Sequence, residues 1–198
     1  MSVFVKICGL RDAKCVAAAV DAGANAIGFV FAKSVRRVSP ADARVACRDV
    51  PDSVQRVAVM RHPSNAEWQS VLETFAPDVL QTDAGDFTDL DVPDTVIRWP
   101  VIRESDVSMP GDCPDVFVYE GKNSGVGETV DWSGAADLTG RGRMILAGGL
   151  AAENVATAIQ TARPWGVDVS SGVESSPGQK DVSLIRQFIS AARAVESY

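Results

Sequence analysis

Histidine is almost absent from this chain, which has one, His62, among its 198 residues. A metal centre built from several imidazoles is therefore excluded, and a Ser-His-Asp triad could use only His62. His62 stands in the stretch RHPSN, which is typical of a turn between a strand and a helix. We expect it to lie in a surface loop.

Cysteine is scarce as well, and the four cysteines are widely spaced, at positions 8, 15, 47 and 113. No pair forms a CxxC motif, so we expect neither a zinc site nor a disulfide framework. Cys15, Cys47 and Cys113 are expected to be small buried hydrophobic side chains. Cys8 differs from them in position, because it ends the apolar stretch VFVKIC and precedes Gly9.

The chain also lacks a surplus of positive charge and any long apolar run. Its 26 acidic and 19 basic residues give a net charge of -7, which argues against a nucleic-acid partner. No apolar run approaches the roughly 20 residues of a membrane span, and the N-terminus enters a predicted strand without a signal peptide. We expect a cytoplasmic protein with no membrane partner.

Short apolar runs, each followed by a turn signal, recur along the chain. Most are continuously apolar rather than alternating, which is typical of parallel strands covered on both faces. The predicted strands are residues 3–7, 26–31, 55–60, 79–81, 96–101, 116–119, 144–147 and 166–169.

Helical patterns lie between these strands. Ser39-Pro40 and Asp181 are predicted to start two of the helices. Eightfold alternation of strand and helix indicates the α/β class and a single (β/α)8 TIM barrel over residues 1–198. An open doubly wound sheet is the alternative, although no GxGxxG follows the first strand. The predicted helices are residues 11–22, one from 41, one from 65, 152–162 and 182–195.

In such a barrel, function is expected at the C-terminal ends of the strands. The stretches LAGGL and DVSSG follow the last two strands, where backbone N–H groups and serine hydroxyls can hold a phosphate. Two tight turns without a ligand are the alternative. The candidate phosphate-binding residues are Gly148, Gly149, Ser170, Ser171 and Gly172.

Two side chains near these strand ends could transfer protons. Cys8 could act as a base or nucleophile if its site favours the thiolate, since a free thiol has a pKa of about 8.5. Asp131, between Val130 and Trp132, could be a general acid if an apolar setting raised its pKa. The alternatives are a buried packing residue for Cys8 and a helix N-cap for Asp131.

Further charged residues fall after the second strand and within the first and last strands. Arg36 follows the second strand and could bind a carboxylate or phosphate through two parallel hydrogen bonds, whereas Arg37 is expected to be a solvated loop charge. Lys6 and Asp168 fall in the first and last strands, which are neighbours in a closed barrel. Because a buried lysine needs a partner, we expect Asp168 to lie near Lys6. Lys6 and Cys8 share strand parity and should point the same way.

Several stretches, in this order, resemble the phosphoribosylanthranilate isomerase family. The resemblance spans nearly the whole chain. It implies a (β/α)8 barrel that converts N-(5-phosphoribosyl)anthranilate to 1-(2-carboxyphenylamino)-1-deoxyribulose 5-phosphate by an Amadori rearrangement in tryptophan biosynthesis, with no metal or organic cofactor. The stretches are KICGL at 6–10, GANAIGFVFAKSVRRVSPADA at 23–43, SGVGETVDW at 124–132, LAGGLAAENVATAI at 146–159 and VDVSSGVESSPGQKD at 167–181.

The resemblance also implies roles for particular residues. It places the family's catalytic cysteine base at Cys8 and its aspartic general acid at Asp131. It places a substrate-binding arginine at Arg36 and the acidic residue of strand eight, also assigned to substrate binding, at Asp168. The family's phosphate loops fall on the glycine and serine residues named above.

The chain departs from the family at two positions, since Asp83 stands where the family usually has histidine and Glu128 where it has a basic residue. Two other functions remain as alternatives. One is another phosphosugar isomerase or epimerase on the same barrel, and the other is a non-catalytic sensor of a phosphate ligand. Each would take a small phosphosugar ligand. The sequence does not determine the oligomeric state, and we favour a monomer.

Overall fold

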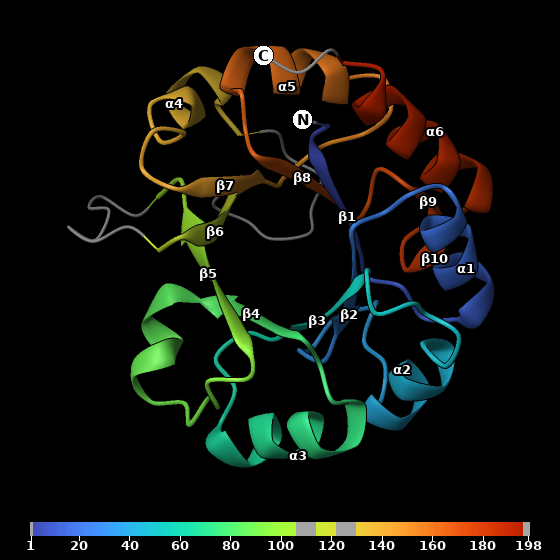
Figure 1. Ribbon diagram of the computed structural model, residues 1–198, viewed down its shortest axis with the longest axis vertical. Helices are drawn as coiled ribbons and strands as arrows, with labels where there is room; N and C mark the ends of the chain where they lie inside the picture. The colour runs from blue at the N-terminus through green and yellow to red at the C-terminus, as the bar shows by residue number, and fades with distance from the viewer. Residues whose placement is uncertain (1, 106–113, 122–129, 196–198) are drawn as a thin grey trace.

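The computed structural model describes residues 2–105, 114–121 and 130–195. Within them, eight parallel strands close into a barrel, and most of the helices form a ring outside it (Figure 1). The first strand pairs with the last, so the barrel has no open edge. The predicted (β/α)8 barrel is therefore confirmed, and the open doubly wound sheet is excluded.

The strands follow the predicted order, with boundaries that differ by a few residues. The fourth and fifth strands each reach two residues further than predicted, to Asp83 and Arg103, which extends them towards the top of the barrel. The strands are β1 (Phe4–Cys8), β2 (Ala26–Val30), β3 (Gln55–Val59), β4 (Val79–Asp83), β5 (Ile97–Arg103), β6 (Val116–Glu120), β7 (Arg143–Leu146) and β8 (Gly166–Val169).

The predicted helices are all present, and side-chain caps mark the starts of most of them. Asp12, Ser39 and Asp181 each accept a hydrogen bond from a backbone N–H in the first turn, as N-caps do. A 3-10 helix and a small hairpin were not predicted. The helices are α1 (Ala13–Asp21), α2 (Pro40–Ala46), α3 (Asn65–Phe75), α4 (Trp132–Ala136), α5 (Val155–Ala162) and α6 (Val182–Arg193); the other elements are η1 (Ala84–Thr88), β9 (Glu174–Ser176) and β10 (Gln179–Lys180).

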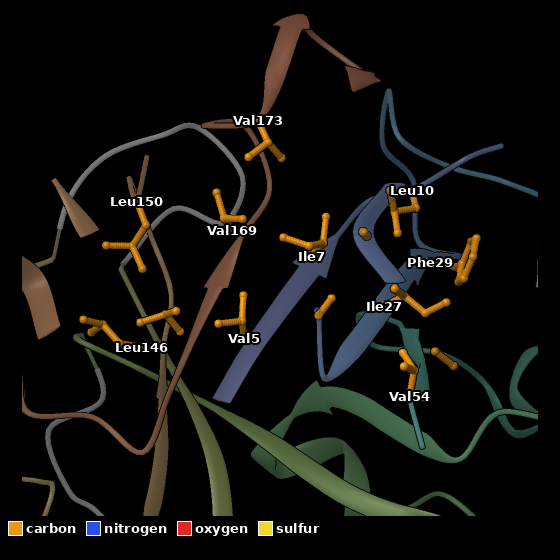
Figure 2. Packing of buried hydrophobic residues seen from close by; sticks show 14 of the residues in the cluster. Val5, Ile7, Leu10, Ile27, Phe29, Val54, Leu146, Leu150, Val169 and Val173 are labelled. Atoms are coloured by element: carbon orange, nitrogen blue, oxygen red, sulfur yellow. The ribbon is translucent and has the colours of Figure 1, made fainter. Parts of the chain in front are cut away.

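Side chains alternate across β1, and the two faces have different roles. Val5 and Ile7 belong to the large apolar cluster that joins the sheet to the surrounding helices. Figure 2 shows Ile7 between Val169 and Ile27, the residues that it opposes on the two neighbouring strands. The other residues of β1 therefore face the interior of the barrel.

The interior is apolar at one end and polar at the other. At the N-terminal end of the strands, Phe4 stacks on Trp165 with ring centroids 4.4 Å apart and meets Trp99 edge-on at 5.8 Å. These aromatic rings fill the bottom of the barrel. The next inward residues of β1 are Lys6 and Cys8, so the interior becomes polar towards the C-terminal ends of the strands.

Some sequence predictions concern residues outside the described ranges, namely Cys113, Glu128 and most of the stretch 124–132. The remaining cysteines, Cys8, Cys15 and Cys47, are buried free thiols. The buried packing role expected for Cys15 and Cys47 is therefore confirmed. Among the helices of the described ranges, none combines the length and apolar character needed to cross a bilayer.

Candidate active site

A cavity of about 200 Å³ opens at the C-terminal ends of the strands. It lies where a barrel of this kind binds its ligands. A larger hollow of about 820 Å³ lies beside it and shares Lys33 and Arg61, but it contains none of the predicted site residues. The smaller cavity is therefore the candidate active site. The predicted residues that line it are Cys8, Arg36, Gly148, Gly149, Asp168, Ser170 and Ser171.

Gly172 does not line the cavity, but it joins the two predicted phosphate loops. It pairs with Ala151 in an isolated parallel bridge. A Cβ atom at position 172 would lie 2.0 Å from the carbonyl oxygen of Leu150, so only glycine allows the two backbones to approach this closely. The loops after β7 and β8 consequently lie against each other on one side of the cavity.

The structure places Lys6 and Asp168 together, as expected. They are register partners on β1 and β8, and Nζ of Lys6 donates to Oδ1 of Asp168 over 3.0 Å. Lys6 is fully buried. Cys8 lies beside this pair, because a Cβ atom added at Gly28 would lie 3.2 Å from both the Cys8 Sγ and the Lys6 Nζ. The thiol of Cys8 and the ammonium group of Lys6 therefore both pack against Gly28.

Opposing effects act on the protonation of Cys8. Burial raises the pKa of its thiol, and the ammonium groups of Lys6 and Lys180 oppose that rise without cancelling it, while Asp168 adds to it. Burial lowers the pKa of Lys6, but Asp168 and Cys8 outweigh burial and raise it overall. Lys6 is therefore a permanent positive charge that can stabilise a thiolate at Cys8.

Asp131 lies outside this cavity. It lines a separate hollow of about 280 Å³ between the ends of β5 and β6 and helix α4, and Arg103 lines both spaces. Its side chain accepts from the backbone N–H of Ser133 over 3.0 Å, so the N-cap role is confirmed. The apolar setting expected for Asp131 is wrong: Val130 is buried, but the chain turns into α4 and leaves Asp131 exposed.

Arg36 lines the cavity but is held by a residue that the sequence analysis did not single out. Its Nε and Nη2 donate to the two oxygens of Glu174 over 2.7 and 2.9 Å. Lys180 donates to the same carboxylate over 2.7 Å. Glu174 and Lys180 flank the Pro177-Gly178 turn of the β9–β10 hairpin, and that dipeptide is a sequence signal from which the turn could have been predicted.

Asp83, one of the two positions at which the sequence departs from the family that it resembles, lies beside Arg103 and His62. Its Oδ1 accepts from Arg103 over 2.5 Å, and its Oδ2 lies 3.2 Å from Nε2 of His62. Nδ1 of His62 lies 2.9 Å from Asp86. The chain's one histidine therefore lies beside position 83, and its two ring nitrogens face different carboxylates. His62 is in an exposed loop, as predicted.

Gln81 also lines the cavity, below Asp83 on β4. Its side-chain oxygen is buried, and no donor within the described parts of the chain reaches it. A buried amide oxygen needs a donor. The cavity wall therefore includes an acceptor suited to a ligand hydroxyl or N–H group.

Comparison with known proteins identifies what the chain is similar to. The sequence profile of the family described as N-(5′-phosphoribosyl)anthranilate (PRA) isomerase matches residues 5–191. A protein of that name from Listeria monocytogenes serotype 4a is 37% identical, over 98% of this chain and all of the relative. One from Desulforamulus reducens is 41% identical, over 98% of this chain and 96% of the relative.

Solved structures of the same enzyme superpose closely. The phosphoribosylanthranilate isomerase of Thermus thermophilus aligns with a TM-score of 0.84 and 30% identity, over 98% of this chain and all of that one. A second isomerase structure, in complex with reduced 1-(o-carboxyphenylamino)-1-deoxyribulose 5-phosphate, aligns with a TM-score of 0.78 and 31% identity, over 96% and 98% of the two chains.

Proposed function

The chain belongs to the N-(5′-phosphoribosyl)anthranilate isomerase family, and we propose that Cys8 is the base and Asp131 the acid of its reaction. The enzyme catalyses the Amadori rearrangement of N-(5-phosphoribosyl)anthranilate to 1-(2-carboxyphenylamino)-1-deoxyribulose 5-phosphate in tryptophan biosynthesis. The observation that carries the assignment of the base is the position of Cys8, in the cavity wall and beside the Lys6 ammonium group.

Formation of the enolamine needs two proton transfers, and the two residues supply one each. Asp131, from the adjoining hollow that shares Arg103 with the cavity, protonates the ring oxygen of the ribose, and the ring opens to a Schiff base. The Cys8 thiolate then removes the proton from C2′, and the resulting enolamine tautomerises to the ketone. Because each step moves only protons and the electron pairs of the substrate, the proposed route uses no cofactor.

The raised pKa of Cys8 constrains this mechanism. At neutral pH only a small fraction of the thiol is ionised, so the reactive form depends on Lys6. The ammonium group lies beside the sulfur before the substrate arrives, and it stabilises the thiolate without any rearrangement. The turnover rate is therefore expected to follow the ionised fraction of Cys8.

The two ends of the substrate are anionic, and the cavity has a candidate group for each. The loops that contain Gly148-Gly149 and Ser170-Ser171 are proposed to bind the phosphate through backbone N–H groups and hydroxyls. Arg36 is proposed to bind the anthranilate carboxylate, since guanidinium matches a carboxylate in shape and charge. Asp168, already paired with Lys6 at the cavity wall, is proposed to contact the substrate from strand β8.

Substitution of the two adjacent arginines tests the assignment of the carboxylate site. Arg36→Ala should raise the KM for N-(5-phosphoribosyl)anthranilate about tenfold or more, as expected for loss of a charged hydrogen bond. Arg37→Ala, in the same loop but outside this cavity, should leave KM unchanged. Circular dichroism would confirm that both variants fold. An unchanged KM in folded Arg36→Ala would remove Arg36 from the carboxylate site.

We propose that residues 1–198 form one barrel domain that works as a monomer in the cytoplasm. The exposed large hydrophobic side chains of the described residues are scattered, with Val35 in the loop after β2, Val45 in α2 and Ile97 in β5. The free thiols suit a reducing compartment. The Thermotoga maritima enzyme is described as dimeric. Sedimentation equilibrium of this protein would distinguish the two states.

A further inference from the structure

A network of charged residues lies behind the cavity and connects its two proposed anion-binding groups. Its centre is Glu174, on β9, whose side chain is 4% exposed. One of its oxygens accepts from Arg36 Nε and Lys180 Nζ, both over 2.7 Å. The other accepts from Arg36 Nη2 over 2.9 Å and from the backbone N–H of Gly178 over 3.2 Å.

These four hydrogen bonds use all the acceptor positions of the Glu174 carboxylate. Burial raises the pKa of Glu174, but the hydrogen bonds from Arg36 and Lys180 outweigh it and hold the pKa at about 2. The group is therefore a carboxylate throughout the physiological range, and it has no capacity left for a ligand. Its role is to hold other side chains.

Lys180 links Glu174 to the phosphate loop. Its side chain is 1% exposed, and Nζ donates to the carbonyl oxygen of Ser170 over 2.8 Å and to the Ser170 Oγ over 3.2 Å. An ammonium group has only donors, so the Ser170 hydroxyl must accept here. Its own hydrogen is then directed away from Lys180, and Ser170 lines the cavity.

We propose that Glu174 and Lys180 are positioning residues that fix the Ser170 hydroxyl as a donor to the substrate phosphate and hold Arg36 for the carboxylate. The chain Arg36–Glu174–Lys180–Ser170 sets the separation between the groups that bind the two anionic ends. This inference rests on the proposed functions of Arg36 and Ser170. Neither Glu174 nor Lys180 lines the cavity, so they act through these two residues.

A double-mutant cycle between Lys180 and Ser170 tests the link, with inorganic phosphate as the probe. Its inhibition constant is measured in competition with N-(5-phosphoribosyl)anthranilate. Lys180→Met and Ser170→Ala should each raise that constant about tenfold. The inhibition constant of the double variant should be no higher than that of Ser170→Ala alone. Lys180→Gln retains one donor for Ser170 and should recover part of the affinity for phosphate.

A second variant tests the centre of the network. Glu174→Gln keeps the shape of the side chain but removes its charge. It should weaken inhibition by phosphate and raise the KM for the substrate. The matched control is Asp78→Asn, because Asp78 also holds an arginine by two hydrogen bonds, of 2.9 and 2.8 Å to Arg56, at the opposite end of the barrel. That control should leave both constants unchanged.

The outcomes separate this inference from the assignment on which it rests. If Ser170→Ala leaves phosphate inhibition unchanged, the proposed role of Ser170 and the network are both overturned. If Ser170→Ala weakens inhibition but folded Lys180→Met does not, or if their effects add, only the positioning role is overturned. Equal effects of Glu174→Gln and Asp78→Asn would likewise contradict it.

Discussion

Lys6 and Asp168 meet across the seam that closes the barrel, with the Lys6 Nζ and the Asp168 Oδ1 3.0 Å apart, although the two residues are 162 positions apart in sequence. The pair lies directly below Cys8 on the inner face of the barrel. Closure of the barrel therefore also builds the charge environment of the proposed base. The two partners act on the Cys8 thiol in opposite directions, which makes their contributions separable.

Substitutions of Lys6 and of Asp168 should shift the pKa of Cys8 in opposite directions. Lys6 lowers the pKa of the thiol and Asp168 raises it. Lys6→Met should therefore move the ionisation midpoint to higher pH, and Asp168→Asn to lower pH. The rate of alkylation by iodoacetamide against pH measures this directly, since the thiolate is the reactive form.

Two internal controls accompany that experiment. Burial raises the pKa of Cys15 to about 11 and that of Cys47 to about 12, so both thiols are largely protonated, and therefore slow to react, at neutral pH. Lys14→Met, on the exposed face of α1, should leave the Cys8 midpoint unchanged. A common midpoint in Lys6→Met, Asp168→Asn and the unaltered enzyme would contradict the electrostatic role of the pair.

Gly28→Ala should impair turnover more than it impairs stability. The new Cβ atom would lie 3.2 Å from both the Cys8 Sγ and the Lys6 Nζ, so both groups would have to move by a few tenths of an ångström. Misplaced catalytic groups can lower rates by about a hundredfold. We expect kcat to fall by about tenfold or more, measured beside the melting temperature. Gly85→Ala, with open space around it, is the control.

The Glu174 network predicts a specific loss of stability in acid. The pKa of Glu174 is about 2 in the folded protein and 4.5 ordinarily, so its stabilisation is complete above pH 4.5 and is lost as the pH falls towards 2. The maximum contribution is about 3 kcal/mol. Urea unfolding between pH 7 and pH 3 should therefore be less pH-dependent for Glu174→Gln, and an equal slope in both proteins would contradict this.

The parts of the site that could be predicted from sequence are those fixed by strand position. Lys6, Cys8 and Asp168 were placed correctly because strand parity decides the direction of a side chain, and barrel closure decides which strands are neighbours. Glycine and serine after the last two strands similarly indicated where the two loops meet. These inferences need only the element order.

The remaining features depend on geometry that local patterns do not encode. Glu174 and Lys180 reach Arg36 and Ser170 only because the β9–β10 hairpin folds back over the end of β8. The exposure of Asp131 follows from the direction in which the chain enters α4. In both cases a turn sets the direction of the side chains. The partners of Glu174 and Lys180 also lie on other elements, which a local sequence pattern does not reveal.

The measurement that tests the central claim most directly is the decay of anthranilate fluorescence when freshly prepared N-(5-phosphoribosyl)anthranilate is added to the enzyme. Cys8→Ala should lower kcat by about a thousandfold, within the range of general base catalysis. Cys15→Ala, another buried thiol at 5% exposure, should retain the full rate. Equal decay in Cys8→Ala and the unaltered enzyme would remove Cys8 from the mechanism.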